Sequence, residues 1–107
     1  MKVCSARIHK NYMEHISLAD IAAAGHISRG ECCRVFKRVR KLSPIQYLTR
    51  FRLEQSLKLL TSTELSVQEI ARQVGFGTGS YFTERFREEL RCTPSEYRRQ
   101  HAAKTEH

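Results

Sequence analysis

The chain has 107 residues, of which 19 are Lys or Arg and 11 are Asp or Glu, and its formal net charge at pH 7 is +8. This length allows one domain, or two small subdomains that share a helix, and leaves little room for a ligand-binding domain. The positive charge favours a polyanion or an acidic membrane surface over an acidic small molecule. No apolar run approaches the roughly 20 residues of a membrane span, and the N-terminus lacks a signal-peptide core. We therefore expect a cytoplasmic protein that does not enter a membrane.

The predicted elements are all helices, because helix starts are clearly marked. A Ser or Thr is followed three residues later by an acid or Gln in five pairs: Ser17/Asp20, Ser28/Glu31, Ser43/Gln46, Ser66/Glu69 and Thr93/Glu96. In such a pair the hydroxyl accepts from the N3 amide and the N3 side chain reaches back to the cap. Pro44 and Pro94 follow two of these caps, at the first helical position, where a missing N–H costs nothing. The pattern predicts an all-α chain.

Seven helices are expected in chain order, at residues 6–14, 18–24, 28–38, 44–60, 67–74, 78–89 and 94–103. The first would pack through a stripe of apolar residues spaced four apart, namely Ile8, Tyr12 and Ile16. The polar residues 100–107 are predicted to form a frayed tail.

The fourth predicted helix, at residues 44–60, has no internal Gly or Pro. At 1.5 Å per residue it would span about 25 Å. Its apolar positions are expected to pack against the segments on both sides; they are Ile45, Leu48, Phe51, Leu57 and Leu60. We expect this helix to act as a stiff spacer between two halves of the chain.

Those two halves repeat one another. Ser17, Ile21 and Ala22 recur as Ser66, Ile70 and Ala71, and after one inserted residue Gly25, Phe36, Pro44 and Tyr47 recur as Gly75, Phe86, Pro94 and Tyr97. Such a repeat indicates one supersecondary unit used twice, here a short helix, a glycine turn and a second helix. The turn glycines are expected to supply a positive φ.

The second helix of each repeat has one apolar and one polar face. In the first repeat the predicted core face is Cys32, Val35, Phe36 and Val39, and the outward face is Arg29, Gly30, Cys33, Arg34 and Lys37. In the second, the predicted inward or marginal residues are Tyr81, Phe82, Arg85, Phe86 and Leu90, and the outward ones are Gly79, Ser80, Thr83, Glu84 and Arg87. A helix-turn-helix places such a second helix in the major groove of DNA, and the small residues Gly30, Gly79 and Ser80 would permit close approach. The alternative is an ordinary helical pair whose outward charges are only solvated.

The four cysteines, at positions 4, 32, 33 and 92, form no C-x-x-C pair. A tetrahedral zinc site needs converging ligands, so we expect no metal site and no cofactor, and reduced, partly buried thiols instead. Redox sensing is the alternative, and it would require a depressed pKa at Cys33 on the outward face.

The second repeat resembles the signature of AraC/XylS-type transcriptional regulators. The residues that carry the resemblance are Ile70-Ala71, Gly75-Phe76, Ser80-Tyr81-Phe82, Phe86-Arg87 and Thr93-Pro94-Ser95-Glu96-Tyr97-Arg98. Weaker matches are Phe36-Lys37, Ser43-Pro44 and Tyr47-Leu48 in the first repeat, and Arg52-Leu53-Glu54 with Leu59-Leu60 in the connecting helix. The likeness covers residues 6–99. It implies two helix-turn-helix subdomains, at residues 6–43 and 61–99, joined by a linker helix at 44–60.

The resemblance also implies which residues read DNA. The base-reading positions fall at Gly30, Cys33 and Arg34 in the first unit, and at Gly79, Ser80, Thr83 and Glu84 in the second; Arg29, Lys37, Arg38 and Arg87 complete the predicted DNA-binding set. Arg34 can take guanine O6 and N7 bidentately, Thr83 can donate, accept or offer a methyl to thymine, and Glu84 can accept from cytosine N4. The two glycines have no side chain to read with.

Two features depart from the family pattern. Lys41 and Arg91 stand where the family often has Gly, and a left-handed non-Gly residue costs about 1–2 kcal/mol. Residues 29–52 hold eight Lys or Arg and one acid, whereas residues 66–97 hold four Arg and five Glu. Because phosphate contacts dominate affinity, the first unit is expected to supply most of the binding energy.

We therefore expect a bacterial, sequence-specific, double-stranded DNA-binding domain that is monomeric and nucleoid-associated and has RNA polymerase as a further partner. Its bipartite site would have halves about one helical turn, ~34 Å, apart. The chain is expected to be cut from a longer regulator, with a small stand-alone member as the alternative. One rival is a protein-interaction module with only non-specific DNA affinity. An enzyme is the other rival, but no nucleophile–base–orienter set is apparent, so catalysis is not expected.

Overall fold

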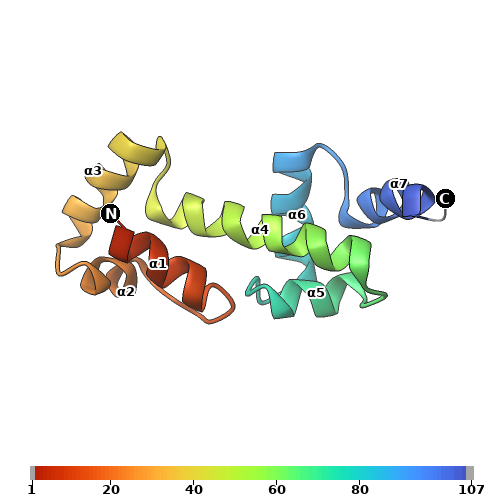
Figure 1. Cartoon of the computed structure of the whole chain (residues 1–107), viewed down its shortest axis with the longest axis horizontal. Coiled ribbons are helices and arrows are strands. Elements are labelled where there is room, and N and C mark those ends of the chain that lie inside the picture. Colours follow the sequence, from red (N-terminus) through yellow and green to blue (C-terminus); the bar gives the residue numbers. More distant parts are fainter. Residues whose placement is uncertain (1, 106–107) are drawn as a thin grey trace. The chain divides into compact units, whose positions relative to one another are not determined.

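The computed structural model describes residues 2–105, with side chains as far as residue 101. This part of the chain is seven α-helices without a strand, as predicted (Figure 1): α1 (Lys2–Asn11), α2 (Leu18–Ala24), α3 (Arg29–Arg40), α4 (Pro44–Ser62), α5 (Val67–Gln73), α6 (Gly79–Leu90) and α7 (Pro94–Thr105). The chain divides into two compact units, Met1–Phe51 and Arg52–His107, and α4 contributes to both.

The predicted helix caps are present in the structure. Four of the five pairs are reciprocal, with cap hydroxyls accepting from the N3 amide at 3.1–3.2 Å and N3 side chains accepting from the cap amide at 2.8–3.2 Å. Ser28 also accepts from the Glu31 amide, at 3.1 Å. A sixth cap was missed: Thr78 accepts from the Tyr81 amide at 3.2 Å. The sequence pattern overlooked it because Tyr81, at the N3 position, is neither an acid nor Gln.

The first helix lies further toward the N-terminus than predicted. Helix α1 covers Lys2–Asn11 rather than residues 6–14, and it buries Cys4 and Ile8, one turn apart. Ile16 is buried as expected, but from the loop after the helix. The shift has a simple cause, since no capping pair marks this helix and the thiol of Cys4 serves as an apolar core group. At the other end, α7 continues to Thr105, and the rest of the predicted tail, residues 106–107, lies outside the described residues.

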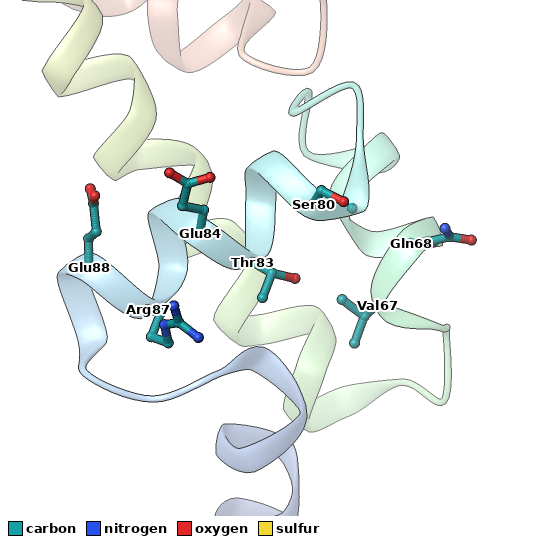
Figure 2. Close-up of a pocket in the computed structure, with 8 residues that line it drawn as sticks. Val67, Gln68, Ser80, Thr83, Glu84, Arg87 and Glu88 are labelled. Atoms are coloured by element: carbon teal, nitrogen blue, oxygen red, sulfur yellow. The ribbon is translucent and has the colours of Figure 1, made fainter.

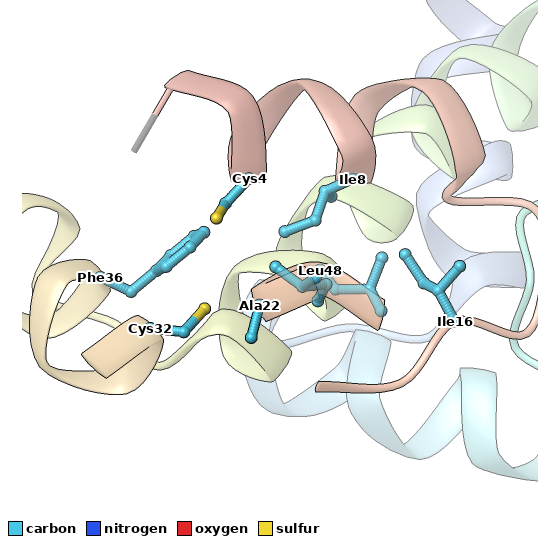
Figure 3. Close-up of a cluster of buried hydrophobic side chains, with 8 residues drawn as sticks. Cys4, Ile8, Ile16, Ala22, Cys32, Phe36 and Leu48 are labelled. Carbon is cyan, nitrogen blue, oxygen red and sulfur yellow. The ribbon is translucent and has the colours of Figure 1, made fainter. Parts of the chain in front are cut away.

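Each unit has its own core. In the first, buried side chains from α1, α2, α3 and α4 form one cluster with Ile16 (Figure 3): Cys4, Ile8, Ile21, Ala22, Cys32, Phe36 and Leu48. In the second, a row of aromatic contacts runs from the turn to α7, with ring centroids 5.2 Å apart for Phe76–Phe82, 5.6 Å for Phe82–Phe86 and 5.8 Å for Phe86–Tyr97. These cores fix which faces of α3 and α6 remain outward.

Three predicted core or marginal residues are exposed. Val39 is 54% exposed, Ile45 42% and Tyr81 47%. Val39 lies near the end of α3, beyond the buried Phe36, and Ile45 follows the fully buried Pro44 at the start of α4. Both side chains therefore lie on the solvent side of their helices. Conversely, α4 buries Leu53 and Ser56, which were not predicted. The Ser56 hydroxyl donates to the Leu53 carbonyl oxygen at 2.6 Å, which satisfies it inside the core.

The two glycine turns align differently from the sequence repeat. Gly25 has φ −97° and is followed by His26 at φ 58°, whereas Val74 has φ −91° and is followed by Gly75 at φ 94°. Gly25 therefore corresponds to Val74 rather than to Gly75, and the residue inserted in the second turn is Gly77, at φ 84°. The expected positive φ is confirmed at Gly75 and wrong at Gly25.

Space, not backbone conformation, explains Gly25. A Cβ atom at this position would lie 2.8 Å from the Cys4 sulfur. The missing side chain thus lets the end of α2 lie directly against α1.

Lys41 and Arg91 end α3 and α6 in the left-handed conformation, both at φ 63°. Their amides donate to the carbonyl oxygens of Lys37 and Arg87, at 3.0 and 2.9 Å. The helices keep the termination that favours glycine, and these two residues bear its strain.

Candidate DNA-binding surface

The outward face of α3 is set by the residues beneath it. Cys32 and Phe36 are fully buried, so Arg34 on the opposite side of the helix points away from the core, whereas Val35 beside them is half-buried. The predicted residues of this face are all solvent-accessible: Arg29, Gly30, Arg34, Lys37 and Arg38 are exposed, and Cys33 is half-buried. The structure thus brings the six residues predicted in the first unit onto one helix, four of them cationic.

Arg34 does not extend freely from this face. Its Nη2 donates to Oε1 of Glu31 at 3.1 Å, one turn earlier on α3. A Cβ atom at Gly30 would lie 3.6 Å from Arg34 Nη1, so the guanidinium lies back over the start of the helix.

The outward face of α6 borders an open groove of about 650 Å³. All five predicted second-unit residues line it, namely Gly79, Ser80, Thr83, Glu84 and Arg87. Glu88 of α6 and Val67 and Gln68 of α5 complete the lining (Figure 2). The groove therefore follows the helix expected to read DNA, with the start of the preceding helix as its other wall.

The charges around α6 are nearly balanced. The Arg85 guanidinium lies 2.8 Å from Glu88 and 3.5 Å from Glu84, and over the Tyr81 ring at 5.6 Å. Among the residues lining the groove, Arg87 is the one cation beside two acids. Such a face attracts phosphate weakly compared with the outward face of α3.

The two glycines of these faces have different surroundings. A Cβ atom at Gly79 would lie 3.0 Å from Cγ of Gln68, so this glycine serves the contact between α5 and α6 within the protein. A Cβ atom at Gly30 would meet nothing closer than Arg34 Nη1 at 3.6 Å. Of the two, Gly30 is the position where the protein itself leaves room.

The buried thiols belong to the core. Burial, with the neighbouring Cys4, raises the pKa of the Cys32 thiol to about 11, so it is protonated at neutral pH.

In the described part of the chain, no group of three or more His, Cys, Asp or Glu side chains could hold a metal ion. None of the helices described has the length and apolar character that crossing a membrane requires.

Sequence reasoning missed four residues of these surfaces. Glu31 was assigned only a capping role, although its spacing of three from Arg34 predicts the observed pair. Glu88 is likewise three residues from Arg85. Val67 and Gln68 reach the groove from another helix, and no spacing along the sequence predicts that.

In each unit, a short helix and a turn lead into a longer helix whose outward face is solvent-accessible, which is a helix-turn-helix. A helix-turn-helix domain family matches residues 21–100. The chain is 45% identical over 92 residues to the transcriptional regulator YdeC of Bacillus subtilis (strain 168), covering 86% of this chain and 32% of that protein. It is 34% identical over 91 residues to the lactose operon transcription activator of Staphylococcus xylosus, covering 85% and 33%.

Solved structures show the same relationship to DNA-binding transcriptional regulators. The chain matches a transcriptional regulator with an AraC-type DNA-binding domain from Chromobacterium violaceum, at TM-score 0.88 and 31% identity, over 94% of this chain and 90% of that one. It also matches the DNA-binding domain of the global transcriptional factor AdpA in complex with a target DNA, at TM-score 0.89 and 27% identity, over 96% and 92%. The chain belongs to the AraC/XylS family of helix-turn-helix transcriptional regulators. It spans about a third of the length of the curated relatives described.

Proposed function

We propose that the chain is the sequence-specific, double-stranded DNA-binding part of a bacterial AraC-type transcriptional regulator. Helices α3 and α6 would enter adjacent major-groove segments, with the eleven predicted residues as the contact set. The observation that carries the proposal is the outward face of α3, where Arg29, Arg34, Lys37 and Arg38 are exposed above a fully buried Cys32 and Phe36. The structure of the similar AdpA domain with its target DNA supports it.

The proposal extends to the form of the complex. The domain would bind as a monomer to two boxes whose centres lie about one helical turn, ~34 Å, apart. It would act on the nucleoid in the cytoplasm, without catalysis, and RNA polymerase would be the further partner. The family membership and the two helix-turn-helix units support this form.

Selection from random duplex DNA at near-physiological salt tests the proposal. Sequencing of the bound pool should give two enriched boxes about ten base pairs apart. One box would mean that α6 does not read DNA by itself. An unenriched pool would refute sequence-specific binding and favour a protein-interaction module with non-specific affinity.

Cysteine labelling can locate the contact face without knowledge of individual base contacts. Cys33 on α3 and Cys92 after α6 are both half-buried, while Cys4 and Cys32 are buried. Alkylation followed by mass spectrometry should modify the first two before the others, because the reagent reaches a buried thiol less easily. A selected duplex should slow labelling of Cys33 and leave Cys92 unchanged. An unchanged labelling rate at Cys33 in the presence of the duplex would contradict contact through the outward face of α3.

A further inference from the structure

Glu31 occupies a position that elsewhere in this chain serves a different purpose. At four helix starts the N3 side chain accepts a hydrogen bond from its cap amide, as Asp20 does from Ser17 and Glu69 from Ser66. The Glu31 carboxylate instead accepts from Arg34 Nη2 at 3.1 Å. One carboxylate of the series is thus directed toward the arginine of the outward face.

The contact leaves most of the Arg34 guanidinium available. The group carries five N–H donors in a fixed plane, and one of the two hydrogens on Nη2 points to Glu31. The Arg34 side chain is 70% exposed and that of Glu31 47%. Whichever Nη2 hydrogen Glu31 accepts, one edge of the guanidinium keeps two parallel N–H donors, and these can meet two acceptors side by side, the pattern that guanine O6 and N7 present.

Gly30 also affects the position of the Arg34 guanidinium. A Cβ atom there would lie 3.6 Å from Nη1, an ordinary van der Waals distance, so the missing side chain leaves the guanidinium room over the start of α3. The N-terminal residues of a recognition helix are the ones that approach base edges. Gly30 therefore leaves space, and Glu31 holds the guanidinium where a base edge would be read.

We propose that Glu31 is a positioning residue for Arg34, and that Gly30, Glu31 and Arg34 form a guanine-specific reading unit at the start of α3. The inference rests on the proposed function, since it concerns the DNA that α3 would bind.

The charge of Glu31 also affects how the unit interacts with phosphate. Paired with a carboxylate, Arg34 attracts phosphate less, because a negative charge lies beside it. A directed contact to a base is retained, so the pair favours guanine over non-specific backbone contact.

The test measures the affinity of the parent chain and of each variant for three kinds of duplex. These are the duplex selected from random DNA, versions of it with each guanine–cytosine pair changed to adenine–thymine, and random duplex. Arg34→Lys keeps the charge and removes the planar fork. We expect it to reduce the discrimination at one guanine by about tenfold. Glu31→Ala should reduce discrimination at that same guanine severalfold while strengthening binding to random duplex. In the Arg34→Lys background, Glu31→Ala should change discrimination no further.

Glu54→Ala is the matched control, because Glu54 is an exposed acid of α4 outside both outward faces. It should alter overall affinity without altering preference for any base, and thermal unfolding would verify that each variant is folded. The inference is overturned if Glu31→Ala leaves guanine discrimination intact, if its effect persists in the Arg34→Lys background, or if Arg34→Lys changes the preference at no guanine. All three results leave the proposed function standing. A pool with no enriched sequence would overturn both.

Discussion

The left-handed residues at the ends of α3 and α6 carry local strain that a single substitution can remove. Lys41 and Arg91 both have φ 63°, a conformation that glycine adopts without steric cost. Lys41→Gly and Arg91→Gly should each raise the free energy of unfolding by about 1 kcal/mol, measured by urea denaturation. As a control, Arg38→Gly removes the same charge from the helical part of α3 and should lower stability by about 1 kcal/mol. Destabilisation by all three changes would show that the side chains of Lys41 and Arg91 matter more than their strain.

Gly25 differs from Lys41 and Arg91, because its backbone conformation suits any residue but there is no space for a side chain. Its φ is −97°, so alanine is conformationally acceptable, but the added Cβ would lie 2.8 Å from the Cys4 sulfur. Overpacking of this kind costs about 1–3 kcal/mol. Gly25→Ala should therefore be destabilising by that amount.

Removal of the opposing sulfur separates this explanation from a general loss of helix-end stability. Cys4→Ala should be mildly destabilising alone, because it leaves a small void. In combination with Gly25→Ala, it should be less destabilising than the sum of the two. Strict additivity of the unfolding free energies would refute the contact between α1 and the end of α2 as the reason for glycine.

At the scale of the element, the caps link stability to pH. Hydrogen bonds from the backbone amide and then the hydroxyl of Thr93 lower the pKa of Glu96, and those of Ser17 lower the pKa of Asp20. A carboxyl group whose pKa is lower in the folded than in the unfolded state stabilises the folded state at pH values above the unfolded-state pKa. This stabilisation is lost as the pH falls through the folded-state pKa. The relevant window lies below about pH 5.

Glu96→Gln tests this link, because Gln46 already accepts from the Ser43 amide at 2.9 Å in the equivalent box. The amide should preserve the cap near neutral pH and remove one titrating group. Urea midpoints at pH 7, 5 and 3 should therefore fall less steeply with acid in the variant than in the parent chain. Parallel declines would mean that the α7 cap does not contribute to the acid sensitivity.

The caps also show what local sequence can and cannot specify. Every helix start that a Ser or Thr pair marks was predicted within one residue, because a cap is a contact between neighbours in the chain. The start of α1 was misplaced, since packing of Cys4 against α2 and α3 decides it. Val39 fits the apolar period of α3 and is nonetheless 54% exposed, because periodicity does not reveal where a core ends.

The same division applies to the candidate site. Helical periodicity placed Ser80, Thr83 and Arg87 on one face, and all three line the groove beside α6. The partner wall from α5 and the use of Gly79 against Gln68 depend on how two helices pack. Likewise, the sequence repeat paired Gly25 with Gly75, whereas the backbone shows the insertion at Gly77. Glycine is required at the two positions for different reasons: a close contact with Cys4 at Gly25 and a positive φ at Gly75.

At the scale of the whole molecule, the uneven distribution of charge should divide affinity unequally between the two units. Arg34, Lys37 and Arg38 are exposed on α3. In the second unit, Arg85 is held between Glu84 and Glu88 at 3.5 and 2.8 Å, and Arg87 shares its groove with both acids. Cations that are already paired within the protein release fewer counterions when DNA binds.

Neutralising each set to Gln removes the same charge from each unit, so the comparison is matched. The salt dependence of binding falls by about 0.9 for each phosphate that the protein no longer neutralises. Arg34 is itself paired with Glu31 and is proposed to face a base, so changing Arg34, Lys37 and Arg38 should reduce the slope of log K against log salt by about 2, with a large decrease in affinity. Changing Arg72, Arg85 and Arg87 should reduce it by less than about 1. Titrations of a selected duplex over a range of salt concentrations would measure both, with circular dichroism to confirm folding. The reverse ranking would place the electrostatic anchor in the second unit, and α3 would then contribute selectivity rather than affinity.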